Sequence, residues 1–427
     1  MAAPVGAGVL ASCGGSSGPG QAAEGGASIW ILTGAPGEAI RTAGIKAFND
    51  ANADTQLAST AFQNDAFKTK IRTAIGANQA PTLIWTWGGG GLADYVKNDQ
   101  VEDLTSWFDE NSDYKSKLFT SAFAAATVED KIYAVPNETV SPIVMYYNKR
   151  VFDKVGAALP TTWEEVMALV PQFNAAGVAP FSLGGQSRWT NMMWLEFLFD
   201  RIGGPELFDA IYKGEANSWS APEAIQALTM VQDLVKANGF INGFESITAD
   251  SNADLAVLYT DKAAMMLHGA WTYGSMKSEG GDFVSGGNLA WSNFPSVQGG
   301  KGDPNNTVGN PASYYAISSK ATDEQKEVAK KYCADILNSE DQNKLWVENG
   351  NVPIVNGSDS LFAGSEDEDF LKFIYDTASA APYFGQSWDQ ALSPAAAEAL
   401  LNNIEQLFGL TITPQQFADN MNAVLGQ

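Results

Sequence analysis

The sequence of 427 residues has few of the residue types on which much enzyme chemistry depends. It holds two cysteines and one histidine, His268. A disulfide scaffold needs more cysteine, and a structural zinc site needs a cluster of cysteine and histidine that this sequence lacks. Catalysis by histidine would depend on a single side chain. Most hydrolase and metalloenzyme classes are therefore excluded, and we expect neither a metal nor a cofactor.

Basic residues are also scarce. The chain has 25 Lys and Arg against 49 Asp and Glu, so its formal net charge is −24. A polyanion gains nothing from neutralising phosphates, so nucleic acid is excluded as a partner. Direct attraction to an anionic membrane surface is excluded for the same reason.

No apolar run reaches the ~20 residues that a membrane span needs. The first ten residues are small and apolar and lead into Leu10-Ala11-Ser12-Cys13, followed by a Gly/Ser-rich stretch. This resembles the end of a signal peptide and the lipobox of a bacterial lipoprotein, with Cys13 as the lipid anchor and a flexible tether after it. Residues 1–27 would form this segment. No Lys or Arg precedes the apolar run, so the alternative is a disordered tail with an incidental cysteine.

The length of the chain suggests two or three domains, at ~100–200 residues per domain. In the first part, short apolar runs alternate with stretches of helical periodicity. We expect strands at 28–33, 56–62 and 81–87, with helices at 39–49 and 66–75 between them. Strands separated by helices of about ten residues predict a parallel sheet with helices on both faces.

The rest of the chain is helix-rich, returns to α/β and ends helical. Further strands are expected at 131–135, 143–148, 263–267 and 314–318, and a helix at 398–425. Thr162 followed by Glu165 is typical of a capping box at a helix start. This order fits two lobes that the chain crosses more than once.

Two motifs suggest ligands and fail on inspection. Gly88-x-Gly90-x-x-Ala93 matches part of a dinucleotide fingerprint, but its strand is not the first in the chain. We expect these glycines instead to allow close approach of the backbone to a ligand. The runs 50–54 and 250–254 imitate calcium loops but lack the required Gly and Glu, so they are read as turns and caps.

Tryptophans in expected loops are more informative. A flat apolar ring suits the C–H face of a pyranose, and neighbouring Asn, Gln, Asp and Arg side chains suit its hydroxyls. The loop tryptophans are Trp87, Trp189, Trp271 and Trp388. The alternative for any such ring is packing in the core, which we expect of Trp30, Trp163 and Trp194. His268 is expected to be a hydrogen-bonded structural residue, and Cys333 a packed thiol.

Several segments match a known family in order. They are Val135–Thr139 before Met145–Lys149, Lys262–Met266 before Gly269–Trp271, and the helical end of the chain. With Cys13 and the tether, the chain resembles the extracellular carbohydrate-binding proteins of ABC importers, solute-binding protein family 1. Gly184–Phe199 and Gln386–Pro394 resemble, more narrowly, actinobacterial xylobiose-binding lipoproteins.

The resemblance implies a two-lobe α/β fold of the periplasmic-binding-protein type, with crossing hinge strands and a ligand cleft between the lobes. Lobe one would comprise residues 28–137 plus 294–338, and lobe two residues 140–291 plus 339–427. The first crossing would fall near Glu138.

The resemblance also implies sugar-binding residues. They are Asn64, Trp87 and Gly88 on lobe one, Glu138 at the hinge, Arg188, Trp271, Trp388 and Asp389 on lobe two, and Asn310 and Tyr314 after a Gly/Pro-rich loop.

The function implied is capture of a short oligosaccharide, such as xylobiose or a related β-1,4-linked disaccharide, without chemistry. A monomer anchored by lipid at the extracellular face of the membrane would deliver the sugar to the permease of an ABC importer. The runner-up is a secreted glycoside hydrolase, for which Glu138 and Asp389 could supply the two carboxyls. A third alternative is an adhesion or scaffold protein that binds polymer only.

Overall fold

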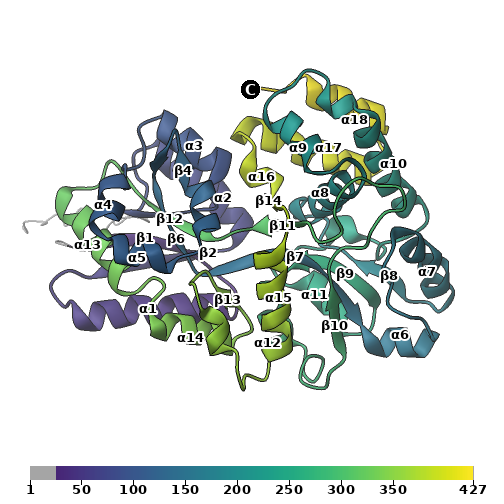
Figure 1. Ribbon diagram of the computed structural model, residues 1–427, viewed down its shortest axis with the longest axis horizontal. Coiled ribbons are helices and arrows are strands. Elements are labelled where there is room, and N and C mark those ends of the chain that lie inside the picture. Colours follow the sequence, from purple (N-terminus) through teal and green to yellow (C-terminus); the bar gives the residue numbers. More distant parts are fainter. Residues whose placement is uncertain (1–25, 427) are drawn as a thin grey trace, which may run out of the picture.

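The computed structural model describes residues 26–426, and their secondary structure forms two lobes, each built on its own sheet (Figure 1). The predictions on residues 1–25, among them the Cys13 anchor, lie outside the described residues. The two-lobe α/β fold expected from the sequence is confirmed. No described helix is long and apolar enough to cross a bilayer.

The lobe-one sheet has five strands in the order β2-β1-β3-β12-β6. These strands are β1 (Ala27–Leu32), β2 (Leu57–Phe62), β3 (Leu83–Thr86), β6 (Ala134–Asn137) and β12 (Ser313–Ile317). β1 pairs in parallel with β2 and β3, as predicted, while β12 runs antiparallel between β3 and β6. β1 and β3 are almost wholly buried, because helices cover both faces of the sheet.

Helices and small elements complete lobe one. The helices are α1 (Gly37–Ala51), α2 (Asn64–Gly76), α3 (Gly89–Lys97), α4 (Thr105–Glu110), α5 (Ser112–Lys117), α13 (Asp323–Asp335) and α14 (Glu340–Glu348). A 3-10 helix η1 (Thr120–Ala126) and a two-stranded ladder, β4 (Thr127–Val128) with β5 (Lys131–Ile132), lie beside them.

The lobe-two sheet is built around β7, the longest strand. β7 pairs antiparallel with β9, β10, β11 and β13 along its length. The strands are β7 (Thr139–Asn148), β8 (Ala179–Ser182), β9 (Ala263–Gly269), β10 (Leu289–Ser292), β11 (Thr307–Asn310), β13 (Val352–Pro353) and β14 (Phe384–Gln386). All ten residues of β7 are buried, so this strand is the centre of the lobe.

Lobe two is rich in helices, as expected. They are α6 (Lys149–Val155), α7 (Trp163–Ala175), α8 (Trp189–Gly203), α9 (Pro205–Tyr212), α10 (Pro222–Lys236), α11 (Ala253–Tyr259), α12 (Thr272–Glu279), α15 (Glu368–Ala380), α16 (Trp388–Ala391), α17 (Pro394–Phe408) and α18 (Pro414–Asn422). The capping box predicted for α7 is present: Thr162 Oγ1 accepts the Glu165 N–H at 3.2 Å, and Glu165 Oε2 accepts the Thr162 N–H at 3.1 Å.

The chain passes between the lobes at three places. The first lies between β6 and β7, at Glu138, whose φ of 64° is in the left-handed region. The second lies between β11 and β12, because β11 pairs with β7 whereas β12 belongs to the lobe-one sheet. The third follows α14, and α15 then lies along the junction (Figure 1).

The structure corrects two expected boundaries. Residues 294–310 belong with lobe two, since Phe294 and Val308 lie in its core and β11 is a strand of its sheet. α14 belongs with lobe one, because it packs on α1 and the guanidinium of Arg41 lies 5.7 Å from the ring of Trp346. The partners that decide the two boundaries, β7 for β11 and α1 for α14, lie more than a hundred residues away in the chain.

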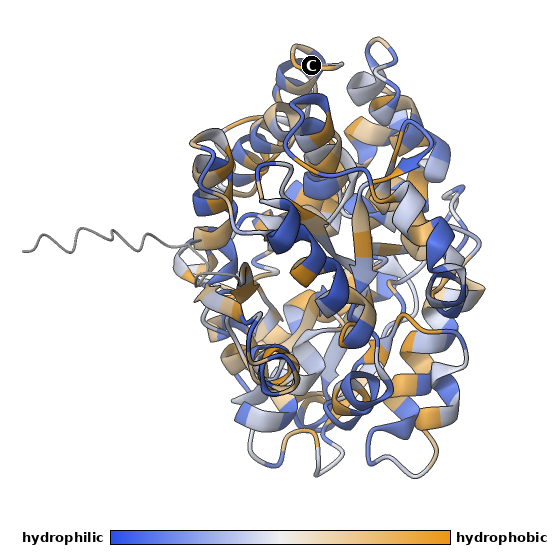
Figure 2. Cartoon of the chain, turned by 90° about the vertical axis from the view of Figure 1, so that its left-hand side faces the viewer, coloured by the Kyte–Doolittle hydropathy of each residue, from blue (hydrophilic) through white to orange (hydrophobic). Residues whose placement is uncertain are grey.

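Two clusters of buried hydrophobic residues form the core: one fills lobe one and continues across the junction to β7, α11, α12 and α15, and the other lies within lobe two. Surface helices carry hydrophilic and hydrophobic residues in alternation, the pattern of helices with one buried face (Figure 2). Trp30, Trp163 and Trp194 are buried, as expected. Cys333 is a packed thiol, also as expected, and burial raises its pKa.

Candidate functional site

A cavity of about 230 Å³ lies between the two lobes. Lobe one lines it with the segment after β1, the start of α2 and the end of β3. Lobe two lines it with the start of α8, the ends of β9 and β11, and α16. In open α/β sheets, ligands bind outside the carboxyl ends of the strands, and this cavity occupies that position in both lobes. We call it the cleft.

Two tryptophans on lobe two form an aromatic corner in the cleft. The rings of Trp189 and Trp271 lie 6.2 Å apart at 46°. His268 packs edge-on against both, at 5.5 Å and 5.6 Å. A Cβ on Gly269 would lie 1.9 Å from the Trp271 ring, so glycine is required beneath this tryptophan. The corner is therefore held from behind by the end of β9.

His268 is fixed by hydrogen bonding, as the sequence predicted. Its Nδ1 accepts the N–H of Gly269 at 2.8 Å, and its Nε2 lies 3.2 Å from Oδ2 of the buried Asp254. The ring therefore orients the two indoles and is not poised beside a nucleophile.

Lobe one presents Trp87 to the cleft. Its ring packs edge-on against Trp85 and Phe67, at 6.3 Å and 6.1 Å. The ammonium of Lys68 lies 5.1 Å from the centre of the Trp87 ring. Aromatic surface thus reaches the cleft from both lobes, which suits the apolar face of a sugar ring.

Arg41 and Glu138 form a bidentate ion pair at the hinge side of the cleft. Arg41 Nε donates to Glu138 Oε1 at 2.7 Å, its second amino group donates to Oε2 at 3.0 Å, and the guanidinium lies 4.6 Å from the Trp85 ring. Burial alone would lower the pKa of Arg41, but the charge of Glu138 and the hydrogen bond to it outweigh burial and raise the pKa. Arg41 therefore fixes both Glu138 and the strained backbone at the crossing.

The two lobes touch directly across the mouth of the cleft. Lys68 Nζ lies 2.9 Å from Asp389 Oδ2. The N–H of Asp65 donates to Asp250 Oδ2 at 3.0 Å, and Trp189 Nε1 donates to Asp65 Oδ1 at 3.2 Å. The start of α2 thus meets three separate segments of lobe two, so the two lobes are in direct contact beside the cleft.

Some buried polar atoms in the cleft have no hydrogen-bond partner among the described residues. They are the indole N–H of Trp85, Oδ1 of Asp250 and Oδ1 of Asn310. Desolvation raises the pKa of Asp250, although the N–H of Asp65 acts against this rise. A buried polar group without a partner costs free energy. One donor and two acceptors of residues that line the cleft are therefore left without partners within the described residues.

Six of the ten predicted sugar-binding residues line the cleft: Asn64, Trp87, Glu138, Trp271, Asn310 and Asp389. The structure brings these residues together from six different segments of the chain. The other four, Gly88, Arg188, Tyr314 and Trp388, lie elsewhere.

Trp388 belongs to the core of lobe two, which corrects the expectation that it binds sugar. Its side chain is 3% exposed and stacks on Phe208, with ring centres 4.5 Å apart and planes at 3°. Phe199 and Trp219 pack edge-on against it. Its neighbours Ser387 and Asp389 face the cleft, so Trp388 points the opposite way.

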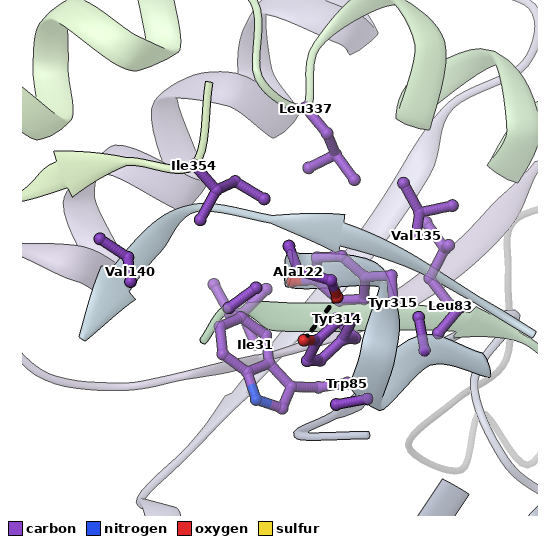
Figure 3. Packing of buried hydrophobic residues seen from close by; sticks show 14 of the residues in the cluster. Ile31, Leu83, Trp85, Ala122, Val135, Val140, Tyr314, Tyr315, Leu337 and Ile354 are labelled. Atoms are coloured by element: carbon purple, nitrogen blue, oxygen red, sulfur yellow. Dashed lines mark hydrogen bonds between the residues drawn. The ribbon is translucent and has the colours of Figure 1, made fainter. Parts of the chain in front are cut away.

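Tyr314 belongs to the core of lobe one, which corrects a second expectation. Its ring is fully buried within β12, and its hydroxyl donates to the carbonyl of Ala122 at 2.8 Å (Figure 3). The hydroxyl is therefore already paired inside the lobe.

Gly88 and Arg188 line a second cavity, which adjoins the cleft beyond Lys68 and Asp389. A Cβ on Gly88 would lie 2.2 Å from the carbonyl oxygen of Ala125, so the glycine allows contact with the chain itself rather than with a ligand in the cleft. Arg188 donates to Glu398 and Asn402 at 3.1 Å and 2.7 Å, which ties it to α17.

Sequence reasoning missed several residues of the cleft, among them Arg41, Lys68 and Asp250. Arg41 and Lys68 are cations within amphipathic helices, where the local pattern predicts only a solvated face. Asp250 was read as part of a turn. In each case the decisive neighbour lies on a distant segment, and no local signal could have found it. Trp189 stood among the loop tryptophans and does line the cleft.

Among known proteins, a model of the family described as bacterial extracellular solute-binding protein matches residues 33–344. A multiple sugar-binding protein of Streptococcus mutans is 26% identical over 236 residues, 54% of this chain and 53% of that protein. A diacetylchitobiose-binding protein of Streptomyces coelicolor is 26% identical over 225 residues, 49% of this chain and 47% of that protein. The chain spans about half the length of the curated relatives it matches.

Solved structures match over nearly the whole chain. A structure from work on xylan utilisation by the thermophilic bacterium Caldanaerobius polysaccharolyticus has a TM-score of 0.85 and 28% identity, covering 94% of this chain and 100% of that one. A chitin oligosaccharide-binding protein has a TM-score of 0.84 and 22% identity, covering 94% and 98%, which shows a shared fold.

Proposed function

Because this chain belongs to the bacterial extracellular solute-binding proteins, we propose that it captures a short oligosaccharide in the cleft and delivers it to the permease of an ABC importer. The best candidates are xylobiose and related β-1,4-linked disaccharides. Relatives named for multiple sugars and for diacetylchitobiose, and the structural neighbour from xylan utilisation, support this class of ligand.

The cleft itself carries the proposal. Trp87 faces it from lobe one and the Trp189–Trp271 corner from lobe two, while Asp250 and Asn310 hold buried acceptors without partners. Pyranose rings offer apolar C–H faces and hydroxyl donors, which this combination would satisfy. Closure of the lobes around the sugar follows from tighter binding to the closed form than to the open one.

Binding without chemistry fits the state of Glu138 and Asp389, the two carboxylates that the sequence offered for catalysis. The glycoside hydrolase alternative needs one free acid and one free base or nucleophile on either side of the sugar bond. Glu138 is held by both nitrogens of Arg41, and Asp389 is paired with Lys68. Oligosaccharide cleaved during long incubation with the protein would favour the hydrolase instead.

The proposal extends to residues and location. Asn64, Asn310 and Asp389 would bind hydroxyls of the sugar, and Trp87 and Trp271 would stack on its rings. The protein would act as a monomer at the extracellular face, anchored by the lipid on Cys13.

Calorimetric titration with xylobiose, cellobiose and diacetylchitobiose tests the proposal. We expect heat of binding with at least one sugar, and a Kd of ~1 μM would correspond to about −8 kcal/mol. Trp271→Ala should abolish this heat, whereas Trp107→Ala should not, because Trp107 is a partly buried indole of α4 outside the cleft. Absence of heat with every sugar would refute capture of a β-1,4-linked disaccharide. A ligand that binds only as polymer would point to the scaffold alternative.

A further inference from the structure

The charges that line the cleft are already matched within the protein. Arg41 and Lys68 are the cationic side chains among the described residues that line it, and three carboxylates stand against them, those of Glu138, Asp250 and Asp389. Arg41 is committed to Glu138 through two hydrogen bonds. Lys68 forms an ion pair with Asp389, with Nζ 2.9 Å from Oδ2. Neither cation is left for a ligand.

The helix end in the cleft is matched as well. The turn before α1 lines the cleft, and the amino end of a helix would by itself attract an anion. Glu38, in the first turn of α1, accepts the N–H of Gly34 at 3.1 Å. Its carboxylate lies in the first turn and offsets the positive end of the helix dipole.

One carboxylate remains in excess. Asp250 Oδ2 accepts the N–H of Asp65, but Oδ1 is buried and has no partner among the described residues. A hydroxyl or amide N–H of a ligand would satisfy this oxygen, whereas a second carboxylate would be repelled by it. Asp65, itself a carboxylate, lies directly behind.

From these pairings we infer that the cleft selects uncharged oligosaccharides and rejects those that carry a carboxylate, with Arg41–Glu138 and Lys68–Asp389 as the pairs that determine this specificity. The inference rests on the proposed function and narrows its substrate class. An acidic sugar would lose its hydration on closure and gain no cation in return, which is the costly case for a buried charge.

Matched sugars separate charge from shape. Cellobiose and cellobiouronic acid differ only by a hydroxymethyl or a carboxylate at one ring. The alditol and the aldonate of xylobiose share an opened reducing end and differ in charge. Where the neutral sugar of a pair binds, we expect the acidic sugar to bind more weakly. Its Kd in calorimetric titration should be at least about 100-fold higher.

Asp389→Asn tests the mechanism. The amide keeps the shape of Asp389 but releases Lys68 from its ion pair, so the ratio of acidic to neutral affinity should rise at least about tenfold. Asp50→Asn is the matched control, because Asp50 pairs with Lys46 on the exposed face of α1 and does not line the cleft. That substitution changes the net charge equally and should leave the ratio unchanged.

The outcomes distinguish the charge selectivity of the cleft from the capture of oligosaccharide itself. An acid that binds within about threefold of its neutral partner, or binds where the neutral sugar does not, overturns the charge selectivity and leaves oligosaccharide capture intact. An unchanged ratio in Asp389→Asn removes the role of the Lys68–Asp389 pair. If no sugar of either kind binds, the proposed function itself fails.

Discussion

Lys68 and Asp389 meet across the cleft, with Nζ 2.9 Å from Oδ2, although 321 residues separate them in the chain. Lys68 belongs to lobe one and Asp389 to lobe two, so the contact exists only when the lobes are closed. Lys68 also covers the face of Trp87. This one side chain therefore joins the closing contact to the aromatic surface of the cleft.

Removing this contact should speed release of the ligand. We expect Lys68→Met to raise the dissociation rate about tenfold, since close charge pairs at an interface act mainly on dissociation. Stopped-flow fluorescence of the cleft tryptophans measures the rate. Lys46→Met, which removes an exposed pair on α1, should leave the rate unchanged. Equal rates in both variants would show that the Lys68–Asp389 pair does not hold the lobes closed.

Two tryptophans that look alike in the sequence should respond in opposite ways. Trp388→Ala removes a ring stacked on Phe208 in the core and should lower the free energy of unfolding by about 3–5 kcal/mol. Trp271→Ala removes a half-buried ring at the cleft and should mainly weaken sugar binding. Urea unfolding and calorimetry of both variants provide the comparison. A stable Trp388→Ala protein that no longer binds sugar would contradict the core assignment.

Tyr314→Phe isolates one hydrogen bond in lobe one. The hydroxyl donates to the carbonyl of Ala122, and its loss should cost about 1 kcal/mol of unfolding free energy. Sugar affinity should not change, because the side chain does not line the cleft. Denaturant midpoints and titration heats of this variant test both statements. A loss of sugar affinity would show that Tyr314 contributes to the binding site.

Glu196 gives the stability of lobe two a pH dependence. Burial raises the pKa of this carboxyl well above its ordinary value of 4.5, and the charge of Asp389 raises it further. The N–H of Trp388, which donates to Oε1 at 2.7 Å, lowers the pKa but does not outweigh burial. The folded protein thus holds the proton to higher pH than the unfolded chain. Its contribution to stability is present below the ordinary pKa and is lost as pH rises.

Glu196→Gln should therefore gain stability relative to the parent as pH rises from about 5 to about 7.5, because the amide cannot ionise. Denaturant titrations at both pH values measure the difference. Glu165→Gln is the control without a pH effect in this range: hydrogen bonds from Thr161 and Thr162 lower the pKa of Glu165, so its contribution is fully present above the ordinary pKa and is lost only at lower pH. A flat difference for Glu196→Gln would show that its carboxyl titrates normally.

Local signals predicted the parts of the fold that depend on neighbours in sequence. The parallel strands β1 to β3 and the capping box of α7 follow from patterns of a few residues. The cleft could be predicted in outline, because loops after such strands converge at one edge of a sheet. Trp87 and Trp271 were found in this way, whereas Asn310 came from the resemblance to the family.

Residues whose role depends on distant partners could not be predicted. Ser387, Trp388 and Asp389 alternate in direction, and only the position of Phe208 decides that the middle residue points into the core. Arg41 in α1 has no local signal of its partner Glu138, which lies 97 residues away. The boundary at residue 294 failed for the same reason, since β11 is assigned by pairing with β7.

The position of β12 has a consequence for how the chain folds during synthesis. This strand, Ser313–Ile317, lies between β3 and β6 and pairs with both. Until it is made, the lobe-one sheet exists as two separate halves with unpaired inner edges, while all of β7 to β11 is already available to lobe two. Strands with open edges are prone to pair with other chains. The growing chain therefore carries the open edges of β3 and β6 until β12 is made, and the last segments of lobe two, β13, β14 and α15 to α18, follow only after that.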